Sequence, residues 1–383
     1  MDFKKMVAGR HNYANAWKSR TGGKVVAWFD PYFPEEIAYA AGLLPIRILA
    51  EHEPDNVSDK WIYSSCYPVR DIVNLFLKGR YDYVDGLVNT ECCQWMYNAF
   101  EVASNNFPLK FNHYFFLPDY TDAPTSKHVT RSEMNVLKNR FEEWTGNKVT
   151  DEGLDEAIAV YNENRLSLRQ IYEMRRQERP VISGSEMMHV LLADQVMDKA
   201  EMNKILKEFI RELESRKPGR DRIRLMLIGS ETWDAALEEM VEQLGADIVA
   251  DDLDNGSSYI WNNVVPNKDR LMSLALRYLD RPHSALKDNN WRRRPQRIFE
   301  MAEDYSIDGA LIAKQIYCHP HGSDTYMVWK LLRERNIPFH YFERSNLLPG
   351  DEMLSRLESF LAILRPGLNH IYGWGRTLDS EEV

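Results

Sequence analysis

The stretch that decides the fold is VDGLVNTECC, residues 84–93. An apolar run of this length that ends on polar residues and thiols is typical of a buried strand in a parallel sheet. It is followed by QWMYNAF at residues 94–100, which has the character of a helix start. The run DGALIAKQIYC at residues 308–318 repeats the arrangement, and helix-forming residues 325–332 follow it. Both stretches therefore predict a strand–helix unit with cysteine at the strand end.

The same alternation extends to both sides of these two stretches. In the first third we predict strands at residues 24–29, 44–49 and 114–117, with helices at 34–41 and 69–77. In the last third we predict strands at residues 224–229, 246–250 and 337–342, with helices at 234–243 and 350–364. Repeated strand–helix units indicate an α/β fold with two doubly wound parallel sheets, of the Rossmann or flavodoxin type.

The middle of the chain contains no predicted strand. Amphipathic stretches at residues 131–144 and 150–175 are helical, and two more helices follow Ser183. Lys217-Pro218-Gly219 is a natural boundary. We therefore predict three parts: an N-terminal α/β domain at 1–130 that carries Cys66 and Cys93, a helical section at 131–218, and a C-terminal α/β domain at 219–383 that carries Cys318.

Composition limits the classes of function. The 383 residues carry a formal net charge of −10 and no long basic tract, which argues against a nucleic-acid or anionic-membrane partner. The short basic cluster at 292–294 is expected to be a solvated helix face, with a phosphate or coenzyme A contact as the alternative. No apolar signal segment opens the chain, and the longest apolar stretch, 37–50, is too short to span a bilayer. We expect a soluble cytoplasmic protein.

The four cysteines are the candidate functional groups. So few thiols argue against a disulfide framework and fit a reducing compartment. In open α/β folds functional groups gather beyond the carboxyl ends of the strands, and thiols at helix starts are poised to be thiolates. Structural zinc sites usually show paired CxxC spacing, which is missing here. An iron–sulfur cluster needs no compact motif, so Cys66, Cys93 and Cys318 could hold three irons and leave a fourth open.

Two other interpretations of the thiols stay open on the residues alone. Free cysteine is among the most buried residue types, and spacing by itself favours inert buried thiols in a protein without metal. A nucleophilic cysteine is the second alternative, because His319 and His321 lie beside Cys318. Pro320 between the two histidines favours a turn over a packed Cys–His pair.

The sequence resembles the 2-hydroxyacyl-CoA dehydratase and benzoyl-CoA reductase family over nearly its whole length. The matching stretches are KVV at 24–26, PEEIAYAAGLLP at 34–45, SCYPVR at 65–70, VDGLV at 84–88 with the cysteine that follows, ADD at 250–252, and DGAL at 308–311 with Cys318.

The resemblance implies a 4Fe–4S cluster on Cys66, Cys93 and Cys318. Counting from residues 84–86 puts Cys93 in register and makes Cys92 a spare thiol, although the Asp that usually follows this cysteine is Gln94 here. A double-cubane branch of the family carries a further cysteine shortly after the strand near residue 229, where this chain has Ser-Glu-Thr at 230–232. That difference disfavours the double-cubane branch.

The resemblance also implies an activity and partners. The chain length is that of the smaller subunit, and we favour the γ-type subunit of an ATP-dependent benzoyl-CoA reductase, which reduces the aromatic ring to a cyclic dienoyl-CoA. The alternatives are the β subunit of a 2-hydroxyacyl-CoA dehydratase, or an electron-transfer subunit whose active site lies on its partner. Implied partners are a larger homologous cluster-bearing subunit, an ATP-hydrolysing activator, ferredoxin upstream and a CoA-thioester substrate. His319 is the candidate proton donor beside the cluster.

Overall fold

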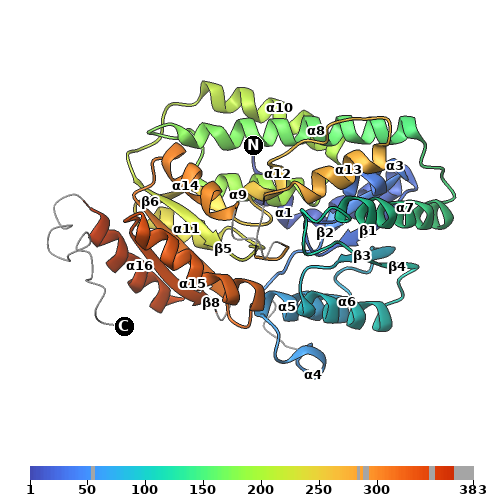
Figure 1. Cartoon of the computed structure of the whole chain (residues 1–383), viewed down its shortest axis with the longest axis horizontal. Coiled ribbons are helices and arrows are strands. Elements are labelled where there is room, and N and C mark those ends of the chain that lie inside the picture. Colours follow the sequence, from blue (N-terminus) through green and yellow to red (C-terminus); the bar gives the residue numbers. More distant parts are fainter. Residues whose placement is uncertain (53–56, 283–284, 288–292, 345–349, 366–383) are drawn as a thin grey trace.

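The computed structural model describes residues 1–52, 57–282, 285–287, 293–344 and 350–365. These residues form two separate four-stranded parallel sheets with helices packed around them (Figure 1). The predicted α/β class with two doubly wound sheets is therefore confirmed.

The strands of both sheets are short and mostly buried, as expected for parallel strands that helices cover on both faces. The first sheet consists of β1 (Lys24–Trp28), β2 (Leu43–Arg47), β3 (Gly86–Thr90) and β4 (Phe111–Phe115). The second sheet consists of β5 (Ile223–Gly229), β6 (Ala246–Asp252), β7 (Gly309–Gln315) and β8 (Phe339–Arg344).

The two sheets share one topology. Their strand orders are β2-β1-β3-β4 and β6-β5-β7-β8. In each sheet the chain leaves the first strand toward one edge and then returns to build the other side. The strand order therefore reverses between β1 and β3, and again between β5 and β7. Such a switch point is where open α/β sheets bind ligands, beyond the carboxyl ends of the strands.

The helices divide by position along the chain. Those that precede or belong to the first sheet are α1 (Phe3–Ala8), α2 (Arg10–Thr21), α3 (Glu35–Ala40), α4 (Asp59–Ile62), α5 (Tyr67–Leu77) and α6 (Gln94–Asn106). Those between the sheets are α7 (Ser126–Thr145), α8 (Asp151–Glu173), the 3₁₀ helix η1 (Met174–Arg176), α9 (Gly184–Asp194) and α10 (Lys199–Ser215). Those of the second sheet are α11 (Ala236–Gln243), α12 (Ser257–Ile260), α13 (Arg270–Leu279), α14 (Arg294–Asp304), α15 (His319–Glu334) and α16 (Asp351–Leu364).

The helices between the sheets contact both halves of the molecule. α7 packs against β4 and α13, α8 against α3 and α12, and α9 against β6 and α11 (Figure 1). The division into three domains at residues 130 and 218 stays a prediction. None of the helices within the described ranges is both long and apolar enough to cross a membrane.

Several elements differ from the sequence-based expectation. Helices α1, α2, α4, α12, α13 and α14 were not predicted. α13 nevertheless carries regularly spaced apolar residues that are buried, among them Leu271, Leu274 and Tyr278, so its sequence signal was overlooked. The expectation of a turn at Pro320 is wrong: α15 begins at His319, six residues earlier than predicted. The proline occupies the first helical turn, where its missing N–H costs no hydrogen bond.

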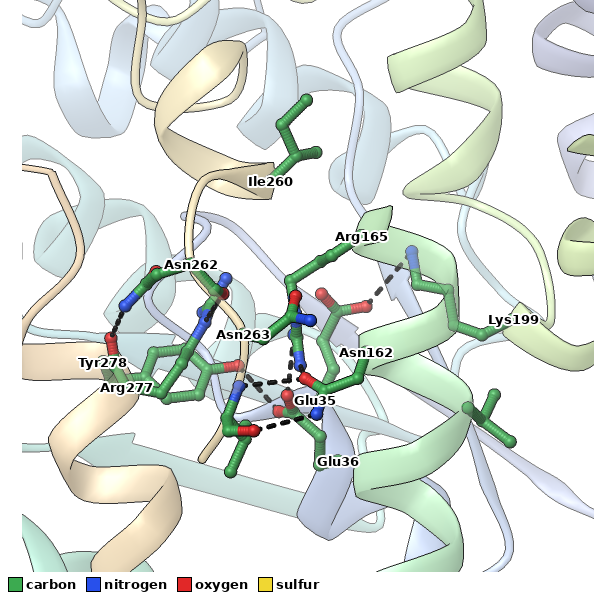
Figure 2. Close-up of polar contacts among 12 residues, drawn as sticks. Glu35, Glu36, Asn162, Arg165, Lys199, Ile260, Asn262, Asn263, Arg277 and Tyr278 are labelled. Atoms are coloured by element: carbon green, nitrogen blue, oxygen red, sulfur yellow. Dashed lines mark hydrogen bonds and ion pairs between the residues drawn. The ribbon is translucent and has the colours of Figure 1, made fainter. Parts of the chain in front are cut away.

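A buried ion pair joins the first sheet's α3 to the rest of the molecule. The Glu36 side chain has no exposed surface, and its Oε1 accepts a hydrogen bond from Arg165 of α8 at 2.8 Å. Its Oε2 accepts one from the Tyr278 hydroxyl of α13 at 2.9 Å (Figure 2). Burial works to raise the pKa of Glu36, but the guanidinium groups of Arg165 and Arg277 together outweigh it, so the net pKa is lowered. The carboxylate is therefore ionised and links three helices.

Glu35 makes a second connection of the same kind. Its Oε1 accepts a hydrogen bond from the Tyr259 hydroxyl of α12 at 2.6 Å. Its Oε2 lies 3.8 Å from Nζ of Lys199 (Figure 2). Lys199 also donates to Asp194. Both glutamates thus connect α3 to helices that belong to the middle and to the second half of the chain. Removing one member of such a buried ion pair strongly destabilises the folded protein, because the other charge stays buried without a partner.

Candidate metal centre between the two sheets

Three cysteines that are far apart in sequence line one cavity. Cys66 immediately precedes α5, Cys93 precedes α6 and Cys318 precedes α15, so each occupies the N-cap position of its helix. Cys92, the predicted spare thiol, lines the same cavity. Two of the three predicted ligands come from the first half of the chain and one from the second.

The cavity lies where the switch points of the two sheets face each other. Besides the cysteines, its walls include Asp30, which follows β1, and Ser230 and Glu231, which follow β5. Cys93 follows β3 and Cys318 follows β7, so the strands on both sides of each switch point contribute a residue. This is the position at which open α/β sheets are expected to bind ligands.

The backbone is constrained at two strand ends beside the cavity. A Cβ atom on Gly229 would lie 2.0 Å from the carbonyl oxygen of Ala313 on β7, so only glycine fits this close approach. The next residue, Ser230, then faces the cavity. After the end of β7, Tyr317 adopts a φ of 63°, in the left-handed region that non-glycine residues rarely use. Tyr317 directly precedes Cys318.

The three thiols influence one another's pKa values. Burial raises the pKa of Cys66, and the neighbouring Cys318 and Cys93 raise it further. Burial also raises the pKa of Cys318 to about 11, with a further contribution from Cys93. Three thiolates that line one cavity repel one another unless a cation lies between them. A bound metal inverts this balance and deprotonates a coordinating thiol outright.

The helix starts offset part of this cost. None of the three cysteines closes a side-chain capping hydrogen bond to its own helix within the described residues. In each helix, however, the backbone N–H three positions after the cysteine favours the thiolate; these amides belong to Val69, Met96 and His321. Amide groups at helix N-termini carry partial positive charge and stabilise anions. The arrangement suits a negatively charged thiolate–metal group.

The adjacent thiols Cys92 and Cys93 are electrostatically distinct. A hydrogen bond from the Cys92 thiol lowers the pKa of Cys93, and the N–H groups of Met96 and Trp95 act in the same direction. That hydrogen bond and burial raise the pKa of Cys92. The pKa of Cys93 is thus lowered and that of Cys92 raised, which favours Cys93 as the ligand; the assignment itself stays a prediction.

The chemistry of the donor set fits a cluster rather than a single ion. Over the described part of the chain, no three His, Cys, Asp or Glu side chains gather closely enough to bind one metal ion. In a 4Fe–4S cluster each cysteine binds a different iron, so its ligands surround the cluster and do not meet at a point. Three separated thiols around one cavity match that requirement.

The two histidines beside Cys318 have different surroundings. His319, the predicted proton donor, is exposed, and its ring packs edge-to-face against Trp95 at 6.3 Å. His321 is buried in the cavity wall, where burial, together with the charge of Arg294, lowers its pKa to about 3. The structure therefore brings His321 into the cavity, and the role of His319 stays a prediction.

Two carboxyl groups in the cavity wall were missed by the sequence analysis. Burial raises the pKa of Asp30 to about 6 and that of Glu231 to about 8. Each has one carboxylate oxygen, Oδ2 of Asp30 and Oε1 of Glu231, without a hydrogen-bond partner among the described residues. Both residues follow the predicted strands at 24–29 and 224–229, and this strand-end position was the signal that could have identified them.

The basic cluster near residue 293 is only partly solvated. Arg293 is exposed as expected, but Arg294 is buried and its Nε donates to Oδ2 of Asp252 at 2.8 Å. The expectation of a solvated face is thus wrong for Arg294, because its charge is paired inside the protein. Residue 292 lies outside the described residues.

These features define an α/β protein with a thiol-lined cavity between two duplicated sheets, and sequence comparison identifies its family. Residues 31–364 match the family described as 2-hydroxyglutaryl-CoA dehydratase, D-component. The chain belongs to this family.

Individual relatives cover nearly the same range. A benzoyl-CoA reductase subunit of Thauera aromatica is 28% identical over 342 residues, which cover 86% of this chain and 88% of that protein. The (R)-phenyllactyl-CoA dehydratase beta subunit of Clostridium sporogenes is 25% identical over 344 residues, covering 88% and 90%. The beta subunit of (R)-2-hydroxyglutaryl-CoA dehydratase from Acidaminococcus fermentans is 23% identical over 348 residues, covering 88% and 91%. The resemblance to CoA-thioester dehydratases and reductases is thereby confirmed.

Proposed function

We propose that this chain is an iron–sulfur subunit of a benzoyl-CoA reductase, with a 4Fe–4S cluster on Cys66, Cys93 and Cys318. The observation that carries the proposal is the convergence of these three N-cap cysteines on one cavity between the switch points of the two sheets. The cluster would supply electrons at low potential. The chain would hold it by its thiolates and stabilise its charge through the helix-start amides.

The choice of benzoyl-CoA as substrate rests on the resemblance to the reductase subunit. In this proposal the chain works with a larger homologous cluster-bearing subunit and receives electrons from an ATP-hydrolysing activator, with ferredoxin upstream. Each electron that enters the aromatic ring requires a proton, and His319 at the outer face of the site is the proposed donor.

A second candidate is the beta subunit of a 2-hydroxyacyl-CoA dehydratase. The family description and two of the relatives favour it, because both carry dehydratase names. The thiol-lined cavity is compatible with either activity. The two candidates are therefore distinguished by the substrate that the enzyme converts.

One assay separates the two candidates. The chain is purified without oxygen together with its partner subunit and is supplied with reduced activator, ATP and benzoyl-CoA. Formation of a cyclic diene is the expected result. No diene, together with turnover of a 2-hydroxyacyl-CoA, would assign the dehydratase instead. A His319→Ala variant is expected to slow ring reduction without changing iron content, and an unchanged rate would remove His319 from the mechanism.

A further inference from the structure

Glu231 lines the cavity that the three cysteines line, and it is a buried carboxylic acid. Its side chain is only 6% exposed. Oε1 is buried and has no hydrogen-bond partner in the part of the chain that the structure describes. Cys66, Cys93 and Cys318 line the same cavity. Leaving a buried carboxylate oxygen unpaired is unfavourable, so this oxygen points to a cationic or proton-donating ligand.

The other carboxylate oxygen of Glu231 is fixed by Arg47. Oε2 accepts a hydrogen bond from Nη2 of Arg47 at 2.6 Å. Arg47 has no exposed surface, and its guanidinium lies 5.9 Å from the Trp28 ring and 5.4 Å from the Trp233 ring. It also donates to Oε1 of Gln195 at 2.9 Å. The arginine is thus held in place and engages Oε2, so Oε1 is the carboxylate oxygen of Glu231 that stays available to a ligand.

The arginine also compensates the charge of the carboxylate. A glutamate without such a cation would place a negative charge beside three thiolates. With Arg47 bound to Oε2, the pair is close to neutral, and Oε1 keeps its lone pairs for a metal ion. Burial raises the pKa of Glu231 in the cavity without metal, whereas iron against Oε1 would favour the ionised form.

We propose that Oε1 of Glu231 is the fourth protein ligand of the cluster and binds the iron that Cys66, Cys93 and Cys318 leave open. Carboxylate oxygen is an established ligand type for iron in proteins. The proposal rests on the proposed function, because it presupposes the cluster. It also specifies that function: with its four irons bound to the protein, this cluster passes electrons to an acyl-CoA without binding it at iron.

Asp30 is the comparison residue in the wall of the same cavity. It is 1% exposed, its Oδ2 also has no hydrogen-bond partner among the described residues, and its Oδ1 accepts from the backbone N–H of Tyr32 at 3.0 Å. Unlike Glu231, it forms no ion pair with an arginine or lysine of the described chain. Lys287 and Arg281 act on Asp30 only through their charge, which lowers its pKa, so Asp30 is the alternative ligand that the test must separate from Glu231.

The test compares anaerobically purified, full-length wild-type protein with E231Q, E231C, D30N and E238Q. Glu238 is the matched control, because it is a buried glutamate with a pKa raised to about 8 by burial, but it does not line the cavity. Iron and sulfide are determined, and EPR spectra are recorded after mild oxidation. We expect E231Q to give about tenfold more of the three-iron cluster signal than the wild type. E231C should restore four irons, and D30N and E238Q should resemble the wild type.

The outcomes separate this proposal from the one on which it rests. Wild-type protein without iron after anaerobic reconstitution would refute both. Wild-type protein with four irons, and an E231Q variant with the same iron content and EPR spectrum, would refute only the glutamate ligand. Loss of the fourth iron in D30N rather than in E231Q would transfer the role to Asp30 and overturn the assignment.

Discussion

The two sheets share a strand order, but their carboxyl edges carry different chemistry. After the third strand of each sheet a cysteine caps the next helix: Cys93 before α6 and Cys318 before α15. After the first strand of each sheet a buried carboxyl group faces the cavity: Asp30 in one and Glu231 in the other. At these positions the halves resemble each other.

The difference lies after the second strand. In the first half the chain continues from β2 to Cys66, which brings a further thiol to the cavity. In the second half β6 ends at Asp252, which forms ion pairs with Arg294 and Arg297. One half therefore supplies two predicted thiol ligands and the other supplies one. Since the site needs both halves, whatever fixes their relative position also shapes the site.

The largest effect is expected from the paired thiols at the end of β3. If Cys93 is the ligand, Cys93→Ala should lower the bound iron about tenfold, because a cluster held by two thiols is lost. Cys92→Ala is the matched control and should keep its iron. Iron and sulfide analysis of anaerobically purified protein measures both. The reverse result would move the ligand to Cys92.

The next effect concerns the buried ion pair that joins the halves. Glu36→Gln leaves the Arg165 charge buried without its partner, and loss of one member of such a pair costs about 3–5 kcal/mol of unfolding free energy. Denaturant unfolding measures the change. The control is Asp155→Asn in the exposed Arg270–Asp155 pair, which should leave the unfolding midpoint nearly unchanged. Equal midpoints for the two variants would show that α3 is not a connection between the halves.

A smaller effect is expected at the glycine that distinguishes β5 from β1. Gly229→Ala places a methyl group against Ala313, and overpacking of this kind costs about 1–3 kcal/mol. The added methyl group should also displace Ser230, and with it Glu231, at the cavity wall. Gly350→Ala is the control, because an added Cβ there meets no atom within 4 Å among the described residues. Thermal unfolding of both variants tests this, and equal transition temperatures would contradict it.

The smallest effect concerns buried glutamates on equivalent helices. Glu36 on α3 has a cationic partner, whereas Glu238 on α11 is 2% exposed and neither carboxylate oxygen has a hydrogen-bond partner among the described residues. Burial raises the pKa of Glu238 to about 8 from its usual 4.5. Its contribution to stability is thus complete below pH 4.5 and is lost as the pH rises through 8.

Glu238→Gln removes that titration. Relative to the wild type, the variant should gain roughly 2 °C or more in transition temperature between about pH 6 and pH 9. Thermal unfolding across this range measures the difference. A constant difference between variant and wild type over the range would show that Glu238 does not titrate there.

The strand–helix units could be predicted from the sequence, because the apolar run that indicates each buried strand lies within about ten consecutive residues. Residues 84–93 and 308–318 are buried strands followed by helices, as their apolar runs indicated. The start of α15 was missed, since a proline can both end a turn and begin a helix. The three cysteines could be selected from their strand-end positions and from the family resemblance.

The convergence of the halves could not be predicted, because it depends on contacts between residues far apart in sequence. Arg47 meets Glu231 only when the second sheet packs against the first. Glu35 and Glu36 resembled ordinary first-turn carboxylates, yet both are buried and paired with distant helices. Hydrophobic periodicity and secondary-structure propensity describe one helix or strand at a time. They contain no information on partners that lie far away in the same chain.

The most direct test of the account is the iron and acid-labile sulfide content of the anaerobically purified chain, in the wild type and in Cys318→Ala. The account predicts about four irons and four sulfides per wild-type chain, with the EPR signal of a reduced 4Fe–4S cluster. It predicts that the variant stays folded but loses most of this iron, because the only predicted thiol ligand from the second half is gone. A folded wild-type protein without iron after reconstitution, or a Cys318→Ala variant with full iron content, would contradict the account.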